Sequence, residues 1–233
     1  MRTLHAVVSQ GLRILQQLVF LRYCLIGEHI LAREDKLVCT DCLATLPTLH
    51  PNYHPHNWAS PATSLDQALC YWDFSPELQS LIHEMKYRRK PVIGEILGRY
   101  MARQVPEVFT MCTGIIPVPL HATRQRERGY NQSAAIARGI GEVSGVTVEE
   151  SFLRRRLYTQ SQTTLSREER RENLTGVFAV PHKCSGRIRN RSLLLVDDVF
   201  TTGATVESAA STLKQAGAAW VGSITLASAS LDT

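Results

Sequence analysis

The sequence predicts an α/β protein with a mostly parallel sheet flanked by helices, preceded by a small module at the amino terminus. From about residue 63 onward, apolar runs typical of buried strands alternate with segments of helical spacing. Residues 1–62 differ, because they carry closely spaced cysteines and a stretch rich in proline and histidine. The 233 residues leave room for one full domain and an appendage. We therefore expect a helix, a Cys-bearing module and a linker over 1–62, and the main domain over 63–233.

Local signals place the elements in order along the chain. Pro76 suits the first turn of a helix, Asn131 suits an amino-terminal cap, and Gly217 suits a helix end. The apolar run at 114–120 is stopped by two prolines, and a loop follows it. The expected strands cover 65–74, 114–120, 176–180, 192–198 and 220–228, and the expected helices cover 76–90, 131–144 and 204–217.

The composition favours a folded protein that meets phosphate groups. Hydrophobic residues make up 44% and charged residues 20% of the chain, which excludes a largely disordered protein. The net charge of +5 suits ligands from a small phosphosugar to a nucleic-acid backbone. Polar residues interrupt the apolar stretch 4–25, so it predicts an amphipathic helix and neither a transmembrane span nor a secretion signal. We expect a cytoplasmic protein, and a peripheral contact with the inner membrane stays open.

The run 193–205, LLLVDDVFTTGAT, carries the main functional signal. Asp197 and Asp198 stand where a buried parallel strand should end, and such sheets bind ligands at that edge. A turn over 201–203 leads into a helix at Ala204, so backbone N–H groups and the positive helix end converge on an anion site. Threonine hydroxyls can donate to phosphate, and the carboxylates can accept from ribose hydroxyls. The alternative is an acidic turn and a Thr-capped helix that bind no ligand.

This run resembles the motif that binds phosphoribosyl pyrophosphate (PRPP) in type I phosphoribosyltransferases. Other segments resemble the ComF family of competence proteins, also called ComF/GntX: LIHEMKY at 81–87, IIPVPLHATRQRERGYNQSAAIAR at 115–138 and RLYTQSQTTLSREERRENLTGVF at 156–178. The resemblance spans nearly the whole chain. It implies a type I phosphoribosyltransferase-like fold that holds PRPP with Mg²⁺, with Asp197 and Asp198 as the catalytic acids. The PRPP-binding residues that it implies are Val199, Phe200, Thr201, Thr202, Gly203, Ala204 and Thr205.

The resemblance implies that the turn after the strand at 114–120 helps to hold pyrophosphate, and the arginines that follow it suit phosphate groups. The segment RERGYNQ could form a mobile hood that closes over a ligand, with a tyrosine ring offered for stacking. The alternative is a solvated basic loop. The pyrophosphate and hood residues expected here are Pro119, Leu120, Arg124, Arg128, Tyr130 and Asn131.

A cationic strip follows, and single-stranded nucleic acid would find it attractive. For any single residue, a solvated helix with internal charge pairs is an equally good interpretation. A second basic cluster, at 86–90, is interpreted as a solvated helix end. The residues expected to contact nucleic acid are Arg154, Arg155, Arg156, Arg167, Arg170 and Arg171.

The cysteines do not form a disulfide framework, since only Cys39 and Cys42 have close partner spacing. Members of the ComF family typically open with two Cys-x2-Cys pairs that bind one zinc, but here Cys24 is followed by Gly27 where a cysteine is expected. The nearest substitute ligand is His29. Either a structural Zn²⁺ binds through Cys24, His29, Cys39 and Cys42, giving a zinc-knuckle-like module, or the module forms without metal.

Two functions compete. The first is a competence protein that handles internalised single-stranded DNA in natural transformation, with PRPP or a related phosphosugar in its loop. Its partners would then include a DNA-uptake helicase or channel at the inner membrane face. The second is an active, Mg-dependent phosphoribosyltransferase that uses PRPP with an unidentified acceptor, and a PRPP-sensing regulator is a weaker variant. The sequence leaves open whether the chain is an enzyme.

Overall fold

The computed structural model describes residues 21–49, 63–156 and 177–229. The chain divides into two compact units, Met1–Thr45 and Leu46–Thr233. In the first unit, α2 (Thr40–Thr45) follows a loop that is closed by an antiparallel bridge between Tyr23 and Ile30. The amino-terminal helix and the domain boundary that we expect after residue 62 lie outside the described residues and stay predictions.

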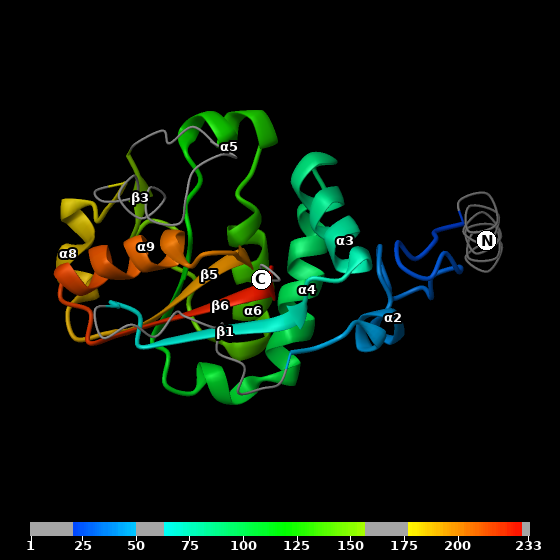
Figure 1. Ribbon diagram of the computed structural model, residues 1–233, viewed down its shortest axis with the longest axis horizontal. Coiled ribbons are helices and arrows are strands. Elements are labelled where there is room, and N and C mark those ends of the chain that lie inside the picture. The colour runs from blue at the N-terminus through cyan, green and yellow to red at the C-terminus, as the bar shows by residue number, and fades with distance from the viewer. Residues whose placement is uncertain (1–20, 50–62, 157–176, 230–233) are drawn as a thin grey trace, which may run out of the picture. The chain divides into compact units, whose positions relative to one another are not determined.

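A four-stranded sheet organises the second unit, in the order β1-β6-β5-β2, and its strand pairs are all parallel. This confirms the α/β class and the parallel sheet, and Figure 1 shows β1, β5 and β6 side by side. The strand expected at 176–180 instead pairs outside this sheet, in a short antiparallel ladder. The strands are β1 (Gln67–Asp73), β2 (Gly114–Pro117), β3 (Arg154–Arg155), β4 (Phe178–Ala179), β5 (Ser192–Phe200) and β6 (Trp220–Ser228).

Side-chain polarity decides which helix faces pack. In α3, Leu78, Leu81, Ile82 and Met85 repeat at helical spacing and are all buried. Asn131 caps α6 as expected, because its side chain accepts from the Ser133 N–H at 3.1 Å. The helices of the second unit are α3 (Pro76–Tyr87), α4 (Pro91–Gln104), the 3₁₀ turn η1 (Pro106–Phe109), α5 (Ala122–Arg128), α6 (Gln132–Ser144), α8 (His182–Ile188) and α9 (Ala204–Gln215).

Helices cover both faces of the sheet. Leu193 and Leu195 share one hydrophobic cluster with residues of α9 and α8. Because side chains alternate along a strand, Leu194 and Val196 face the other side, where α6 contacts β5 and β2 and packs against α4. Over the ranges that the structure describes, no helix is both long and apolar enough to cross a bilayer.

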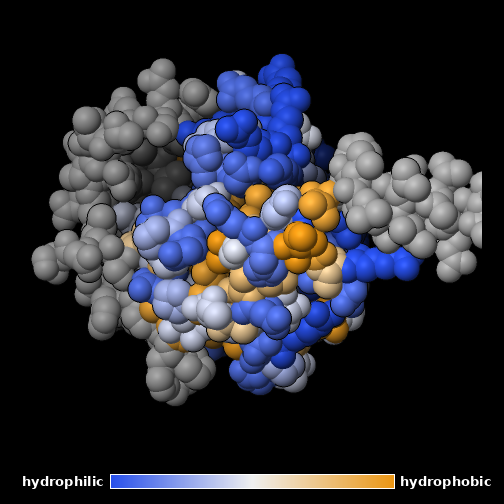
Figure 2. All heavy atoms as spheres, turned by 90° about the vertical axis from the view of Figure 1, so that its right-hand side faces the viewer, coloured by the Kyte–Doolittle hydropathy of each residue, from blue (hydrophilic) through white to orange (hydrophobic). Residues whose placement is uncertain are grey.

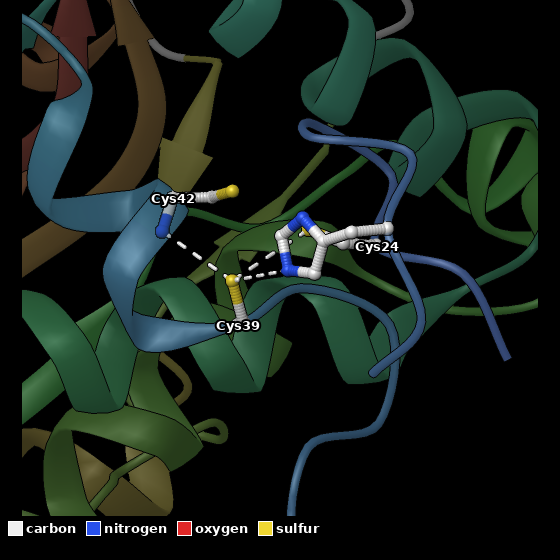
Figure 3. Close-up of side chains that lie close together, drawn as sticks. Cys24, Cys39 and Cys42 are labelled. Atoms are coloured by element: carbon white, nitrogen blue, oxygen red, sulfur yellow. Dashed lines mark hydrogen bonds between the residues drawn. The ribbon is translucent and has the colours of Figure 1, made fainter. Parts of the chain in front are cut away.

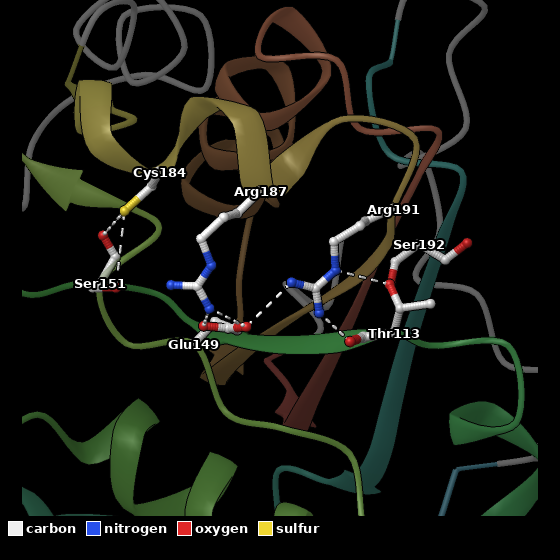
Figure 4. A network of polar contacts seen from close by, with 7 residues as sticks. All are labelled: Thr113, Glu149, Ser151, Cys184, Arg187, Arg191 and Ser192. Atoms are coloured by element: carbon white, nitrogen blue, oxygen red, sulfur yellow. Dashed lines mark hydrogen bonds and ion pairs between the residues drawn. The ribbon is translucent and has the colours of Figure 1, made fainter.

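A polar network ties the amino-terminal ends of two neighbouring strands (Figure 4). Glu149 is 8% exposed. Its carboxylate accepts hydrogen bonds from Arg187 and Arg191, each at 3.1 Å. The Arg191 Nε donates to Thr113 Oγ1 at 3.2 Å, and both guanidinium groups stand over the ring of Phe152. Thr113 precedes β2 and Arg191 precedes β5, so the network braces the edge of the sheet opposite the acidic pair.

Candidate functional site

The acidic pair lies inside β5 and not at its end. β5 continues through Asp197 and Asp198 to Phe200, and it stays paired with β6 as far as the register Phe200 to Ser228. The expectation that the strand ends at the acids is therefore wrong by two residues. The reason is that Val199 and Phe200 extend the ladder, and Phe200 is buried.

Asp197 is held by two donors. The Ser133 hydroxyl donates to Asp197 Oδ1 at 2.8 Å, and the Asp198 backbone N–H donates to the same oxygen at 2.9 Å. Burial and the adjacent Asp198 charge raise the pKa of Asp197 to about 7, although these hydrogen bonds and Lys86 act in the opposite direction. The carboxyl therefore exchanges its proton near neutral pH.

Asp198 forms an ion pair that sequence analysis missed. Lys86 Nζ lies 2.9 Å from Asp198 Oδ2, and the two side chains are 21% and 9% exposed. The basic cluster at 86–90 is thus not simply a solvated helix end, because its first residue reaches the acidic pair. Helical spacing could have indicated that Lys86 points toward the core, because it follows Ile82 by four residues and lies beside the buried stripe of α3.

The turn after β5 has the expected form. Gly203 is left-handed with φ +74°, and a Cβ there would lie 2.5 Å from the Phe200 ring, so only glycine fits. Thr202 Oγ1 accepts from the Ala204 N–H at 3.4 Å, and α9 begins at Ala204 as predicted. Thr201 is exposed and Thr205 is partly exposed. The two carboxylates near the end of the β5 ladder, the hydroxyl-bearing turn and the start of α9 thus follow one another within 197–205.

The hood segment is helical only in its first part: α5 ends at Arg128, where we expected a loop, and 129–131 connect it to α6. α5 begins after His121, whose Nδ1 accepts from the Thr123 N–H at 3.2 Å, and imidazole caps are not among the common capping signals. The Tyr130 hydroxyl donates to the Met85 carbonyl, and burial raises the pKa of Tyr130 to about 12. Asn131 Nδ2 donates to the Val118 carbonyl at 3.0 Å. Tyr130 and Asn131 thus tie this segment to α3 and to the residue after β2, while Pro119 and Leu120 also follow β2 and are partly exposed.

The cationic strip is only partly described. Arg154 and Arg156 are exposed on and beside β3, whereas Arg155 is partly buried, with its guanidinium carbon 5.5 Å from the Phe178 ring centre. Burial lowers the pKa of Arg155, and nearby Arg124 adds to that effect. Arg155 is therefore less available to a polyanion than its neighbours. The expected contacts Arg167, Arg170 and Arg171 lie outside the described residues.

The first unit carries a separate cluster of sulfur and nitrogen ligands (Figure 3). One ligand atom from each of Cys24, His29, Cys39 and Cys42 lies within 4.8 Å of the others. Cys39 Sγ is 3.9 Å from Cys24 Sγ and 3.4 Å from His29 Nε2. A tetrahedral zinc with Zn–S bonds of about 2.3 Å sets two sulfurs about 3.8 Å apart, so the cluster fits such an ion.

Gly27 shows why the missing cysteine leaves no gap. A Cβ at Gly27 would lie 2.6 Å from His29 Nδ1 and 2.8 Å from Cys42 Sγ. The imidazole therefore fills the space that a side chain at 27 would need. Burial raises the pKa of Cys42 to about 12, and the sulfurs of Cys39 and Cys24 add to the rise. Ionising all three thiols at this spacing would require a cation between them.

Comparison with known proteins agrees with this geometry. The family model described as "Phosphoribosyl transferase domain" matches residues 126–232. The chain is 31% identical over 195 residues to the DNA utilization protein YhgH of Escherichia coli O157:H7, covering 82% of this chain and 83% of that protein. It is 28% identical to competence protein F of Haemophilus influenzae, covering 70% and 73%. It is 20% identical to competence protein ComFC of Streptococcus pneumoniae, covering 81% and 86%.

Proposed function

We propose that this chain, which belongs to the ComF family of the phosphoribosyltransferase superfamily, handles single-stranded DNA in natural transformation and holds a phosphosugar at the end of β5. The observation that carries the proposal is the acidic pair Asp197 and Asp198 beside the Thr-Thr-Gly turn and the start of α9. The names of the competence relatives support the DNA-handling role over a working transferase with an unidentified acceptor.

The site has groups that can bind both parts of a phosphosugar, the ribose and the phosphate. Asp197 and Asp198 accept from the vicinal hydroxyls of a ribose, and the hydroxyls of Thr201, Thr202 and Thr205 donate to its 5-phosphate. The first turn of α9 adds backbone N–H groups and the positive end of the helix dipole. PRPP fits these groups, together with Mg²⁺, which prefers oxygen ligands and offsets the charge of pyrophosphate. A 2-deoxyribose lacks one of the two hydroxyls, so the loop favours PRPP over a DNA sugar.

The same residues would serve catalysis if the chain were a transferase. Carboxylates beside the ribose would stabilise positive charge that develops at C1 as pyrophosphate leaves. Pyrophosphate release from PRPP, measured against a panel of nucleobases and amines, separates a transferase from a protein that only binds PRPP.

For the first unit, we propose one structural Zn²⁺ held by Cys24, His29, Cys39 and Cys42. Two observations support this ion: the distance between the Cys24 and Cys39 sulfurs fits tetrahedral zinc, and the His29 imidazole fills the space beside Gly27. The ion would hold a short loop and α2 together, since a unit of this size buries little apolar surface of its own.

Calorimetry with PRPP and Mg²⁺ tests the phosphosugar site. The wild type should bind, and the double variant Asp197→Ala with Asp198→Ala should lose binding; a wild type that releases no heat on titration shows that the loop does not bind PRPP.

Binding of a single-stranded oligonucleotide should weaken steeply with salt, and further when Arg154, Arg155 and Arg156 are changed to Gln. Salt-independent binding would argue against the DNA role. A cytoplasmic location with a helicase or channel partner at the inner membrane face stays part of this proposal.

A further inference from the structure

A cleft opens between the carboxyl-terminal end of α3 and the hood helix α5. Its volume is about 480 Å³, within the range of roughly 300–1,000 Å³ that is common for small-molecule sites. Figure 2 shows strongly hydrophilic residues gathered at the top of the molecule, where Figure 1 places α5 and the upper end of α3. The cleft is lined by Lys86, Tyr87, Arg89, Arg124, Glu127 and Arg128.

The lining is strongly cationic, because four of the six side chains carry a positive charge and one carries a negative charge. Arg89 spans the cleft, since its guanidinium donates to the Glu127 carbonyl at 3.0 Å. Its backbone is left-handed, with φ 54°, which is uncommon for a residue other than glycine. Such a lining selects an anionic ligand and disfavours neutral or cationic ones.

An exposed aromatic ring stands among these charges. Tyr87 is 62% exposed, although it packs 4.7 Å from the His83 ring, centre to centre. The Arg128 guanidinium carbon lies 5.4 Å from the centre of the Tyr87 ring. A phosphate site alone does not need an exposed ring, whereas a base and its phosphate need both a stacking surface and cations.

We propose that this cleft binds one nucleotide unit of single-stranded DNA, with the base stacked on Tyr87 and the adjoining phosphates held by Arg89 and Arg124. The inference rests on the proposed DNA-handling function and gives it a site other than the cationic strip at 154–156. A duplex keeps its bases stacked inside, so the ring selects single strands.

Lys86 connects this cleft with the acidic pair. Its side chain lines the cleft, and its ammonium group is bound to Asp198 at 2.9 Å. A phosphate in the cleft competes with Asp198 for the same ammonium group. DNA in the cleft and a phosphosugar on β5 are therefore adjacent ligands that share one cation.

The test measures binding of a fluorescent oligothymidylate and of an abasic oligonucleotide of equal length. Wild type should bind the oligothymidylate more tightly than the abasic strand. Tyr87→Ala should weaken oligothymidylate binding about 5- to 150-fold, the size expected for one stacked base, and should leave abasic binding unchanged. Tyr87→Phe keeps the ring and should bind as wild type does.

Two further variants separate charge from position. Arg89→Gln should weaken both oligonucleotides, whereas Arg103→Gln, which removes the same charge from the exposed end of α4, should not. A urea denaturation midpoint like that of the wild type checks that Tyr87→Ala is folded. Equal affinity of wild type and Tyr87→Ala for oligothymidylate would overturn the cleft site while leaving the DNA role intact. If the wild type binds neither strand at low salt, both the site and the DNA role fall.

Discussion

Replacing Asp197 by Asn should make the ligand-free protein more stable above neutral pH. Burial and Asp198 raise the pKa of Asp197 from the ordinary 3.8 to about 7. Each pKa unit corresponds to about 1.4 kcal/mol, so keeping the carboxylate ionised in the folded state costs at most about 4 kcal/mol. Residual hydration reduces this, and we expect a gain of about 2–4 kcal/mol for Asp197→Asn at alkaline pH. Asn keeps an oxygen that can accept from Ser133.

The pH dependence carries the sharper test. Because the folded-state pKa is raised, the contribution of Asp197 to stability is fully present below pH 3.8 and is lost as the pH rises to about 7. Urea denaturation of both proteins between about pH 4 and pH 8 should therefore show a difference that grows with pH and then levels off. Asp198→Asn is the variant for comparison. It removes the charge that helps to raise the pKa of Asp197, but it also leaves Lys86 without its ion pair. A pH-independent difference, or a less stable Asp197→Asn at pH 8, would refute the reasoning.

Other changes test the remaining contacts. Gly203→Ala should cost about 1–2 kcal/mol of unfolding free energy, because φ is +74° and the new Cβ would meet the Phe200 ring; Gly186→Ala, whose Cβ meets nothing within 4 Å, is the control in the same urea titration. Glu149→Gln should lower the unfolding free energy by about 1–3 kcal/mol, since two arginines lose their carboxylate, and an unchanged denaturation midpoint would show that solvent replaces it. Purified wild type should contain one zinc per chain, and His29→Ala should retain less than half of it after dialysis against a chelator; equal retention would exclude the imidazole as a ligand.

Elements whose signals are local were predicted correctly. The apolar run at 220–228 became β6 with the same bounds, and Asn131 caps α6 as its residue type indicates. Contacts between distant segments were not predictable, because no local pattern pairs Lys86 with Asp198 across more than a hundred residues. The helix α5 was not predicted, because its cap is a histidine and its sequence is mostly charged. The helix at 91–104 was not anticipated, although Pro91 stands in its first turn as Pro76 does in α3 and was an available signal for a second helix start.

The crowding around Gly27 constrains how this ligand set could be exchanged for one with two Cys-x2-Cys pairs. Gly27→Cys alone would place a side chain 2.6 Å from the His29 imidazole, and His29→Ala alone would leave three ligands. Any stepwise exchange of the fourth ligand therefore passes through a chain with either a crowded or an incomplete site. In the zinc site that we propose, each single substitution that leads from one ligand set toward the other should therefore weaken zinc binding.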